Sequence, residues 1–287
     1  MANRKRKRRL RRSAVLVALL ALVAIGVFVA VGYLQQNQTL VRERCTAVVG
    51  PDSYELAPDQ AANAALVTGL SVKRGLPPRA ASIAIATAIQ ESKLRNIAYG
   101  DQDSVGLFQQ CPSQDWGTQE QLLDPVYAAN AFYDVLVQIE GYEDLPITDA
   151  AQRVQRSAFP AAYADHEDEA RAFASALTGH SPGSLNCTLR RPEAPGDPQG
   201  VVSKLTTAFG NYPTTAGNDV VVVEASGTQG WAVAHWAVAS AKALNITGVS
   251  FAGLQWSRAE AEWPVAETES GQIRITVAGP DDINGDN

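Results

Sequence analysis

Glu91 is the residue whose type and surroundings best suit acid catalysis in this chain. It follows an apolar stretch, residues 83–89, that carries no charge, and a polar loop, residues 100–104, comes after it. Residues 106–110 then read Gly-Leu-Phe-Gln-Gln. An apolar environment favours the neutral, protonated form of a carboxyl group. A general acid in such an environment therefore keeps its proton near neutral pH. We therefore expect a carboxylic acid beside backbone donors and glutamines, as acid-catalysed glycoside cleavage requires.

Two aspartates of the polar loop, Asp101 and Asp103, are candidates for a second carboxylate. Glycoside hydrolases use a pair of carboxyl groups whose separation decides the stereochemical outcome. The alternative is that both aspartates serve only the turn, because aspartate is a common turn residue. A cleavage route that needs one carboxylate would leave both without a catalytic role.

The elements that must position Glu91 are short helices. Ala84, Ala88 and Glu91 fall on one face of a helix expected over residues 79–94. Pro58-Asp59 predicts the start of a preceding helix, and Asp124-Pro125 the start of a later one. Thr148 is expected to cap a further helix, and a last one is expected over residues 165–178. Residues 45–187 are thus predicted to form a mainly α domain with long loops.

Two motifs in this region resemble a known family. Glu91-Ser92, followed by Ser104-x-Gly106-Leu107-Phe108-Gln109, resembles the lysozyme-like, soluble lytic transglycosylase family. The run GLFQQ-x-PSQ-x-WG, residues 106–117, is similar to a branch of that family in actinobacterial cell-surface proteins. The resemblance covers about residues 56–179. It implies a lysozyme-like fold and a peptidoglycan glycan strand as substrate.

The resemblance also implies roles for individual residues. Glu91 would protonate the glycosidic oxygen and then act as base while the 6-hydroxyl of the sugar attacks, which gives a 1,6-anhydro product. The family's Ala-Tyr-Asn-Ala-Gly motif is replaced by Ala162-Tyr163-Ala164, which lacks its asparagine and glycine. Trp116 and Phe108 can contact sugar or pack in the core. The residues expected to bind substrate are Ser104, Gly106, Phe108, Gln109, Gln110, Trp116 and Tyr163.

Two functions from different classes are compatible with these features. The first is a membrane-anchored enzyme of lytic transglycosylase or muramidase type that cleaves glycan strands outside the cell. The second is a catalytically inactive peptidoglycan-binding or envelope scaffold protein with a lysozyme-like fold.

The N-terminus predicts a membrane anchor. Residues 1–12 carry eight basic side chains and no acid, and residues 13–34 carry no charge and are long enough to cross a bilayer core of about 30 Å. Cations before the apolar segment place the N-terminus in the cytoplasm and the rest of the chain outside. A cleaved signal peptide is the alternative, although its apolar core is usually only about 7–15 residues long. The remaining chain has 16 basic against 30 acidic residues, which argues against nucleic acid as a partner.

Three cysteines then lie in an oxidising compartment. Cys45 and Cys187 lie at the two ends of the predicted α domain, so a disulfide between them would join its termini. Cys111 lies in the loop region near Glu91 and is expected to be the unpaired one. No Cys-x-x-Cys pair occurs, and we expect neither a metal nor another cofactor.

The expected organisation is a basic tip (1–12), a transmembrane helix (13–34), a stalk (35–44) and the α domain (45–187). A linker (188–200), a small α+β module (201–279) and a polar tail (280–287) follow. The α+β module resembles a degenerate zinc peptidoglycan carboxypeptidase-like domain, but its last strand lacks the family's His-x-His ligands. His235 is its one histidine and is expected to be partly buried in a helix, so we expect the module to be free of metal and non-catalytic.

Overall fold

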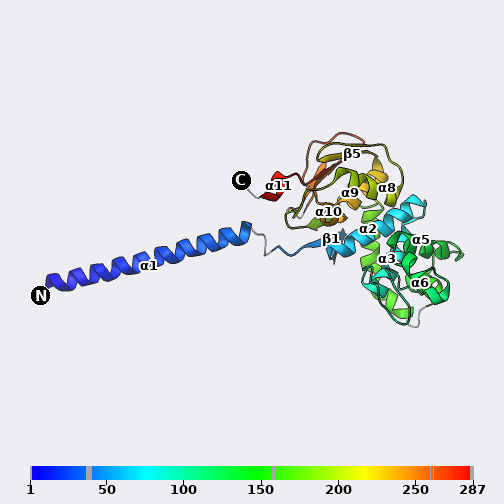
Figure 1. The fold of residues 1–287 in the computed structure, drawn as a ribbon, viewed down its shortest axis with the longest axis horizontal. Coiled ribbons are helices and arrows are strands. Elements are labelled where there is room, and N and C mark those ends of the chain that lie inside the picture. Colours follow the sequence, from blue (N-terminus) through cyan, green and yellow to red (C-terminus); the bar gives the residue numbers. More distant parts are fainter. Residues whose placement is uncertain (1, 37–40, 157–159, 259, 261, 285–287) are drawn as a thin grey trace. The chain divides into compact units, whose positions relative to one another are not determined.

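The computed structural model describes residues 2–36, 41–156, 160–258, 260 and 262–284 (Figure 1). The chain divides into two compact units, residues 1–42 and residues 43–287. The second unit combines helices with two antiparallel sheets. The expectation of a mixed α and β chain that follows an N-terminal apolar helix is confirmed.

The first unit consists of one helix, α1 (Ala2–Gln36). Its segment Val15–Gly32 is apolar and fully exposed. By length and composition this helix is able to cross a membrane, and a signal sequence near the N-terminus would have the same properties.

A three-stranded sheet holds both ends of the region 45–187. Strands β1 (Arg44–Val49) and β2 (Asp52–Leu56) form a hairpin, and β3 (Leu185–Thr188) pairs with the other side of β1. Cys45 and Cys187 lie directly opposite each other in the β1–β3 register and form a disulfide. The predicted pairing of these two cysteines is therefore present.

Four helices of this region begin at a proline or next to a capping residue. Helix α2 (Pro58–Lys73) and helix α3 (Pro78–Ser92) both begin at a proline, whose fixed backbone angle suits the first helical position. Helix α4 (Gln119–Leu122) has Thr118 in a capping box, and α5 (Pro125–Leu136) has Asp124 as its cap. The short 3₁₀ helix η1 (Pro112–Gln114) precedes α4.

Three further elements complete the helical layer. Helix α6 (Ile147–Gln155) begins two residues earlier than a cap at Thr148 would place it, with Pro146 at the cap position, so the prediction that Thr148 caps this helix is wrong. The 3₁₀ helix η2 (Pro160–His166) leads into α7 (Glu167–Leu177). Helix α7 packs along α3.

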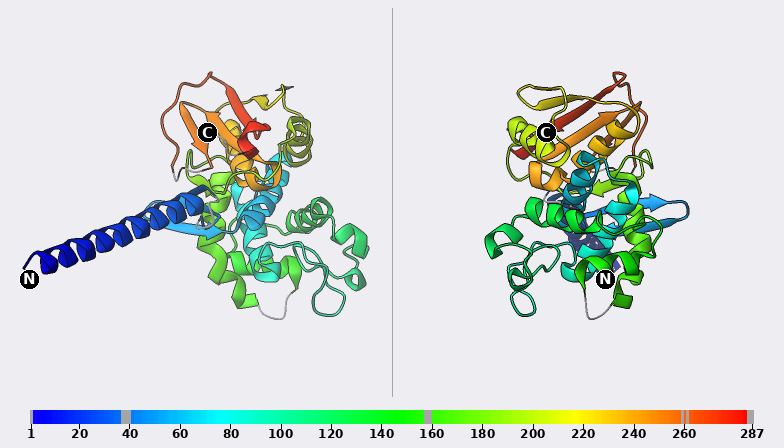
Figure 2. Two further views of the ribbon diagram at one scale, coloured as in Figure 1. Left: turned by 60° about the vertical axis from the view of Figure 1, so that its left-hand side comes forward. Right: turned by 90° about the vertical axis from the view of Figure 1, so that its right-hand side faces the viewer.

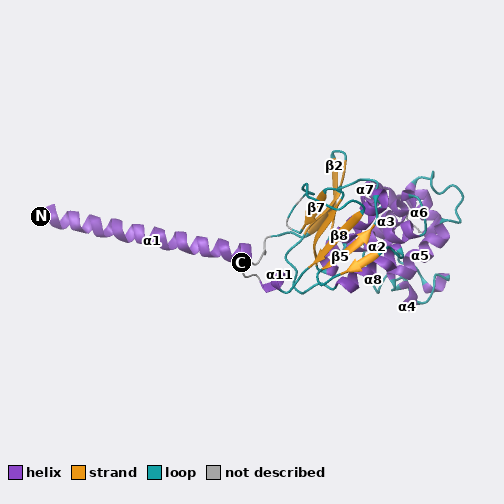
Figure 3. Ribbon diagram, turned by 90° about the horizontal axis from the view of Figure 1, so that it is seen from above, coloured by secondary structure: helices purple, strands orange, loops and turns teal. Residues whose placement is uncertain are grey.

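The later part of the chain forms a second sheet with helices beside it (Figure 3). Its strands are β4 (Thr214–Ala216), β5 (Val220–Glu224), β6 (Ile246–Phe251), β7 (Leu254–Ser257) and β8 (Gln272–Val277), and they lie in the order β4-β5-β8-β6-β7. The helices are α8 (Pro198–Phe209), α9 (Gly227–Ala239), α10 (Ala241–Leu244) and α11 (Asp281–Asn284). His235 lies in α9, so the expectation that this residue belongs to a helix is confirmed.

The later helices pack directly on the earlier ones (Figure 2). Helix α8 approaches α2 so closely that a methyl group on Gly69 would come within 2.9 Å of the Ala208 Cβ. Two indole N–H groups, from Trp256 and Trp263, donate to the carbonyl oxygens of Cys187 and Leu185 on β3, at 3.2 and 2.8 Å. The buried apolar side chains of residues 43–287 therefore form one continuous core, and the predicted linker 188–200 lies within this unit.

Candidate functional site

Helix α3 brings a carboxyl group to the edge of the core. Its side chains from Ala80 to Ile89 are all buried, and Glu91 is its penultimate residue. The helix ends because Lys93 and Leu94 both adopt left-handed backbone angles, with φ of 56° and 55°. Glu91 is consequently half-buried, at the point where the apolar helix meets the loop that follows.

The Glu91 carboxyl has two hydrogen-bond donors. The buried Tyr163 hydroxyl of η2 donates to Oε1 at 2.5 Å, and the Gln155 side chain at the end of α6 is the second donor. Burial raises the pKa of Glu91, and the hydrogen bonds from Tyr163 and Gln155 oppose this rise only in part. A raised pKa favours the protonated form, as a general acid requires.

Ser92 joins the end of α3 to the loop that carries the predicted glycine and glutamines. Its buried hydroxyl donates to the Ala88 carbonyl at 3.1 Å and to the Leu107 carbonyl at 2.7 Å. Gly106 has a φ of 82°, and its N–H donates to the Ile97 carbonyl at 2.7 Å. The loop is therefore fixed to the same helix end that positions Glu91.

Gln109 stabilises the two loops beside Glu91. Its Oε1 accepts a hydrogen bond from the Ser104 hydroxyl at 3.1 Å. Its Nε2 donates to the carbonyl oxygens of Gly106 and Tyr99, at 3.2 and 3.3 Å. The amide is thus oriented by the protein before any ligand binds.

The two aspartates have different environments. Both carboxylate oxygens of Asp103 accept from Ser113, at 2.8 Å from its N–H and 2.9 Å from its hydroxyl, and these bonds lower the pKa of Asp103. Asp101 is exposed and lines the same cavity as Glu91. Of the two aspartates, only Asp101 is among the residues that line the cavity.

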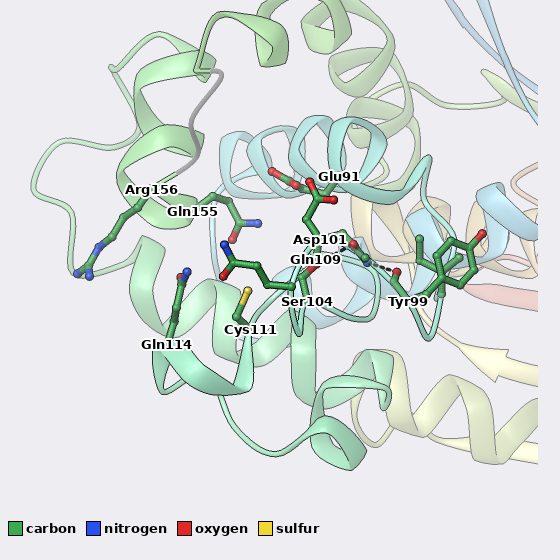
Figure 4. Close-up of a pocket in the computed structure, with 12 residues that line it drawn as sticks. Glu91, Tyr99, Asp101, Ser104, Gln109, Cys111, Gln114, Gln155 and Arg156 are labelled. Carbon is green, nitrogen blue, oxygen red and sulfur yellow. Dashed lines mark hydrogen bonds between the residues drawn. The ribbon is translucent and has the colours of Figure 1, made fainter.

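Glu91 lies in an open cavity of about 720 Å³ (Figure 4). Ten of the twelve lining residues lie between positions 91 and 114, in the stretch around the acid: Glu91, Ile97, Tyr99, Gly100, Asp101, Gln102, Ser104, Gln109, Cys111 and Gln114. The other two are Gln155 and Arg156.

Gln155 and Arg156 were missed by sequence reasoning. They end α6, 64 and 65 positions after Glu91, and no local motif marks them. The one sequence signal near them was the altered motif at Ala162-Tyr163-Ala164, which pointed to this part of the chain.

Besides the fully buried Tyr163, which contacts Glu91 instead, three predicted substrate-binding side chains do not line the cavity. Phe108 is fully buried and stacks on Phe132, with ring centroids 4.7 Å apart. Gln110 is also buried, and its Nε2 faces the Ala128 carbonyl. Trp116 packs partly buried against the core and is not among the lining residues. These three side chains pack on the inner side of the loop, because most of their contacts are with apolar or buried groups.

Cys111 is a free thiol in the wall of the cavity. Burial raises its pKa, and the nearby Asp103 carboxylate raises it further. The thiol is therefore neutral near pH 7 and a weak nucleophile. Within the described ranges, no three histidine, cysteine or acidic side chains gather in a way that could hold a metal ion.

No family model matches this chain, and no curated protein matches it. The geometry of the cavity therefore has to carry any functional conclusion.

Proposed function

We propose that this protein cleaves peptidoglycan glycan strands outside the cell membrane, with Glu91 as the acid. One observation carries the proposal. The half-buried carboxyl group of Glu91 favours its protonated form, and it faces an open cavity rich in hydrogen-bonding side chains. A lysozyme-like fold for residues 45–187 is part of this proposal. Its support is the sequence resemblance and the position of Glu91 at the end of a buried helix.

In the proposed reaction Glu91 gives its proton to the glycosidic oxygen while the bond from that oxygen to C1 breaks. The Glu91 carboxylate then removes the proton of the 6-hydroxyl, whose oxygen bonds to C1. The product is a 1,6-anhydro sugar, and Glu91 regains its proton. Attack by water, with Asp101 as the second carboxylate, would give a reducing end instead.

The proposed setting is the outer face of a membrane crossed once by α1. Eight basic side chains before the apolar segment favour a cytoplasmic N-terminus. The Cys45–Cys187 disulfide supports an oxidising compartment for the second unit.

Binding without cleavage is the second candidate. The observation that favours it is the amide-rich lining of Gln102, Gln109, Gln114 and Gln155, which suits recognition of hydroxyl and N-acetyl groups. Under this proposal the protein would hold a glycan strand at the cell surface.

Mass spectrometry of digested peptidoglycan sacculi separates these functions. Full-length protein in detergent is incubated with sacculi, beside Glu91→Gln and the control Glu120→Gln, which changes an exposed acid of α4 outside the cavity. Anhydro sugars from wild type and control, but not from Glu91→Gln, are expected. Reducing ends would indicate hydrolysis, binding without products would indicate the second function, and absence of binding would overturn both.

A further inference from the structure

The two ends of the cavity differ in charge. Among the lining residues Glu91 and Asp101 carry carboxyl groups, and Arg156 carries a guanidinium group. Arg156 lies at the opposite end from Tyr99, and Glu91 lies between them (Figure 4). A ligand that lies along the cavity therefore meets a positive charge at one end only.

Arg156 is not used to stabilise the fold through an ion pair. No acid in the described part of the chain pairs with its guanidinium, and the residue is exposed. Other arginines of this unit do have such partners, for example Arg74 with Asp134 at 2.6 Å. The Arg156 side chain is consequently available to a ligand.

The backbone at Arg156 has an unfavourable conformation. Residue 156 follows the last turn of α6 with φ 53° and ψ 35°, and its N–H donates to the Gln152 carbonyl. This left-handed conformation suits glycine and disfavours a residue with a branched or long side chain. Non-glycine residues in such conformations occur disproportionately at functional sites. At Arg156 the conformation ends α6 beside the cavity and fixes the backbone from which the side chain extends.

The guanidinium group of Arg156 determines which kind of ligand group it can bind. It is planar, permanently charged and offers paired N–H donors that match a carboxylate. A neutral glycan would leave this charge without a partner. A glycan whose sugars carry carboxylates would place one of them there while a neighbouring glycosidic oxygen faces Glu91.

We infer that Arg156 selects glycan strands that bear carboxylate substituents and fixes their direction relative to Glu91. This inference rests on the proposed function, because it assumes a glycan in the cavity. It adds that the substrate is anionic and that its anionic group lies on the side of α6. Arg156 is thereby a specificity-determining residue rather than a catalytic one.

The test compares two glycans of equal length. One carries free lactyl carboxylates after removal of its peptides, and the other contains only N-acetylglucosamine. Binding is measured with the full chain in detergent, in a Glu91→Gln background so that no cleavage occurs. The matched control is Arg153→Gln, which removes an exposed arginine from the same helix but outside the cavity.

We expect roughly two- to fivefold tighter binding of the carboxylated glycan at low ionic strength, as for a solvent-exposed charge pair. Arg156→Gln should remove this preference and leave the affinity for the neutral glycan unchanged, whereas Arg156→Lys should retain part of it. Arg153→Gln should keep the full preference, and high salt should reduce it.

Equal binding of both glycans, or a preference that survives Arg156→Gln, would overturn the inference while glycan cleavage by the wild type still stood. If neither glycan bound, both the proposed function and the inference about Arg156 would fail. A normal preference without any cleavage of sacculi by the wild type would support the inference and select the binding function.

Discussion

Removal of the Cys45–Cys187 disulfide should strongly destabilise the unit 43–287. The two cysteines are separated by 142 positions. In the chain-entropy model a cross-link over a loop of that length lowers the entropy of the unfolded chain enough to stabilise the fold by about 5 kcal/mol. Replacement of both cysteines by alanine should therefore lower the free energy of unfolding by up to about 5 kcal/mol.

Alanine is the appropriate replacement because both cysteines are fully buried. Serine would add two buried hydroxyl groups, and each without a partner would cost about 1–3 kcal/mol of its own. The β1–β3 register places the two positions opposite each other in a hydrogen-bonded ladder, so the strands keep their pairing without the covalent bond. The change then acts mainly on the unfolded state.

Urea unfolding followed by tryptophan fluorescence measures this effect. Trp256 and Trp263 both donate to carbonyl groups of β3, so their emission reports on the strand that carries Cys187. The unfolding midpoint should fall, and the slope with urea should increase because the uncrosslinked chain exposes more surface. Cys111→Ala, which keeps the disulfide, is the control and should change stability by less than about 1 kcal/mol. An unchanged midpoint for the double variant, or an equal loss in the control, would refute the reasoning.

Three further predictions concern protonation. Tyr163→Phe removes a donor that lowers the pKa of Glu91, so the alkaline limb of the pH–rate profile for glycan cleavage should move to higher pH; an unmoved limb would contradict this. Burial acts to raise the pKa of Glu43, but hydrogen bonds from Lys242 and Arg190 lower this pKa to about 2. Its stabilisation is therefore full above pH 4.5 and is lost as the pH falls towards 2, and Glu43→Gln should remove that part of the acid dependence in urea titrations. Burial lowers the pKa of His235 to about 4, so the unfolded chain takes up the proton first and stability should decline as the pH falls from 6.5 to 4. His235→Gln should flatten that decline, and an identical decline in the variant would show that other groups cause it.

Local signals in the sequence predicted much of the helical layer. A proline with an acidic residue beside it predicted the starts of α2 and α5. This signal lies within a few adjacent residues. The uncharged run before Glu91 correctly predicted a buried helix with the acid at its end. Such features depend on neighbours in sequence, and they are therefore visible without the structure.

Apart from the Cys45–Cys187 disulfide, the features that depend on distant parts of the chain were not predicted. Strand β3 exists because β1 offers it a partner about 140 positions earlier, and helix α8 is held by its close approach to Gly69 on α2. Gln155 reaches Glu91 only because α6 packs against α3. His235 was expected to be partly buried but is fully enclosed, because Trp231 and Trp263 cover its ring.

The position of the disulfide also decides how the protein would carry mechanical load. In the proposed setting the chain is held at one end by a membrane and at the other by a glycan in the cavity, so tension enters at the start of β1. The Cys45–Cys187 bond gives that tension a second covalent route into the body through β3, in parallel with the route through β2. Separation of β1 from β3 at Cys45 would then require rupture of a covalent bond in addition to the hydrogen bonds of the ladder. The residues around Glu91 lie inside the closed loop and would keep their geometry while the anchor is pulled.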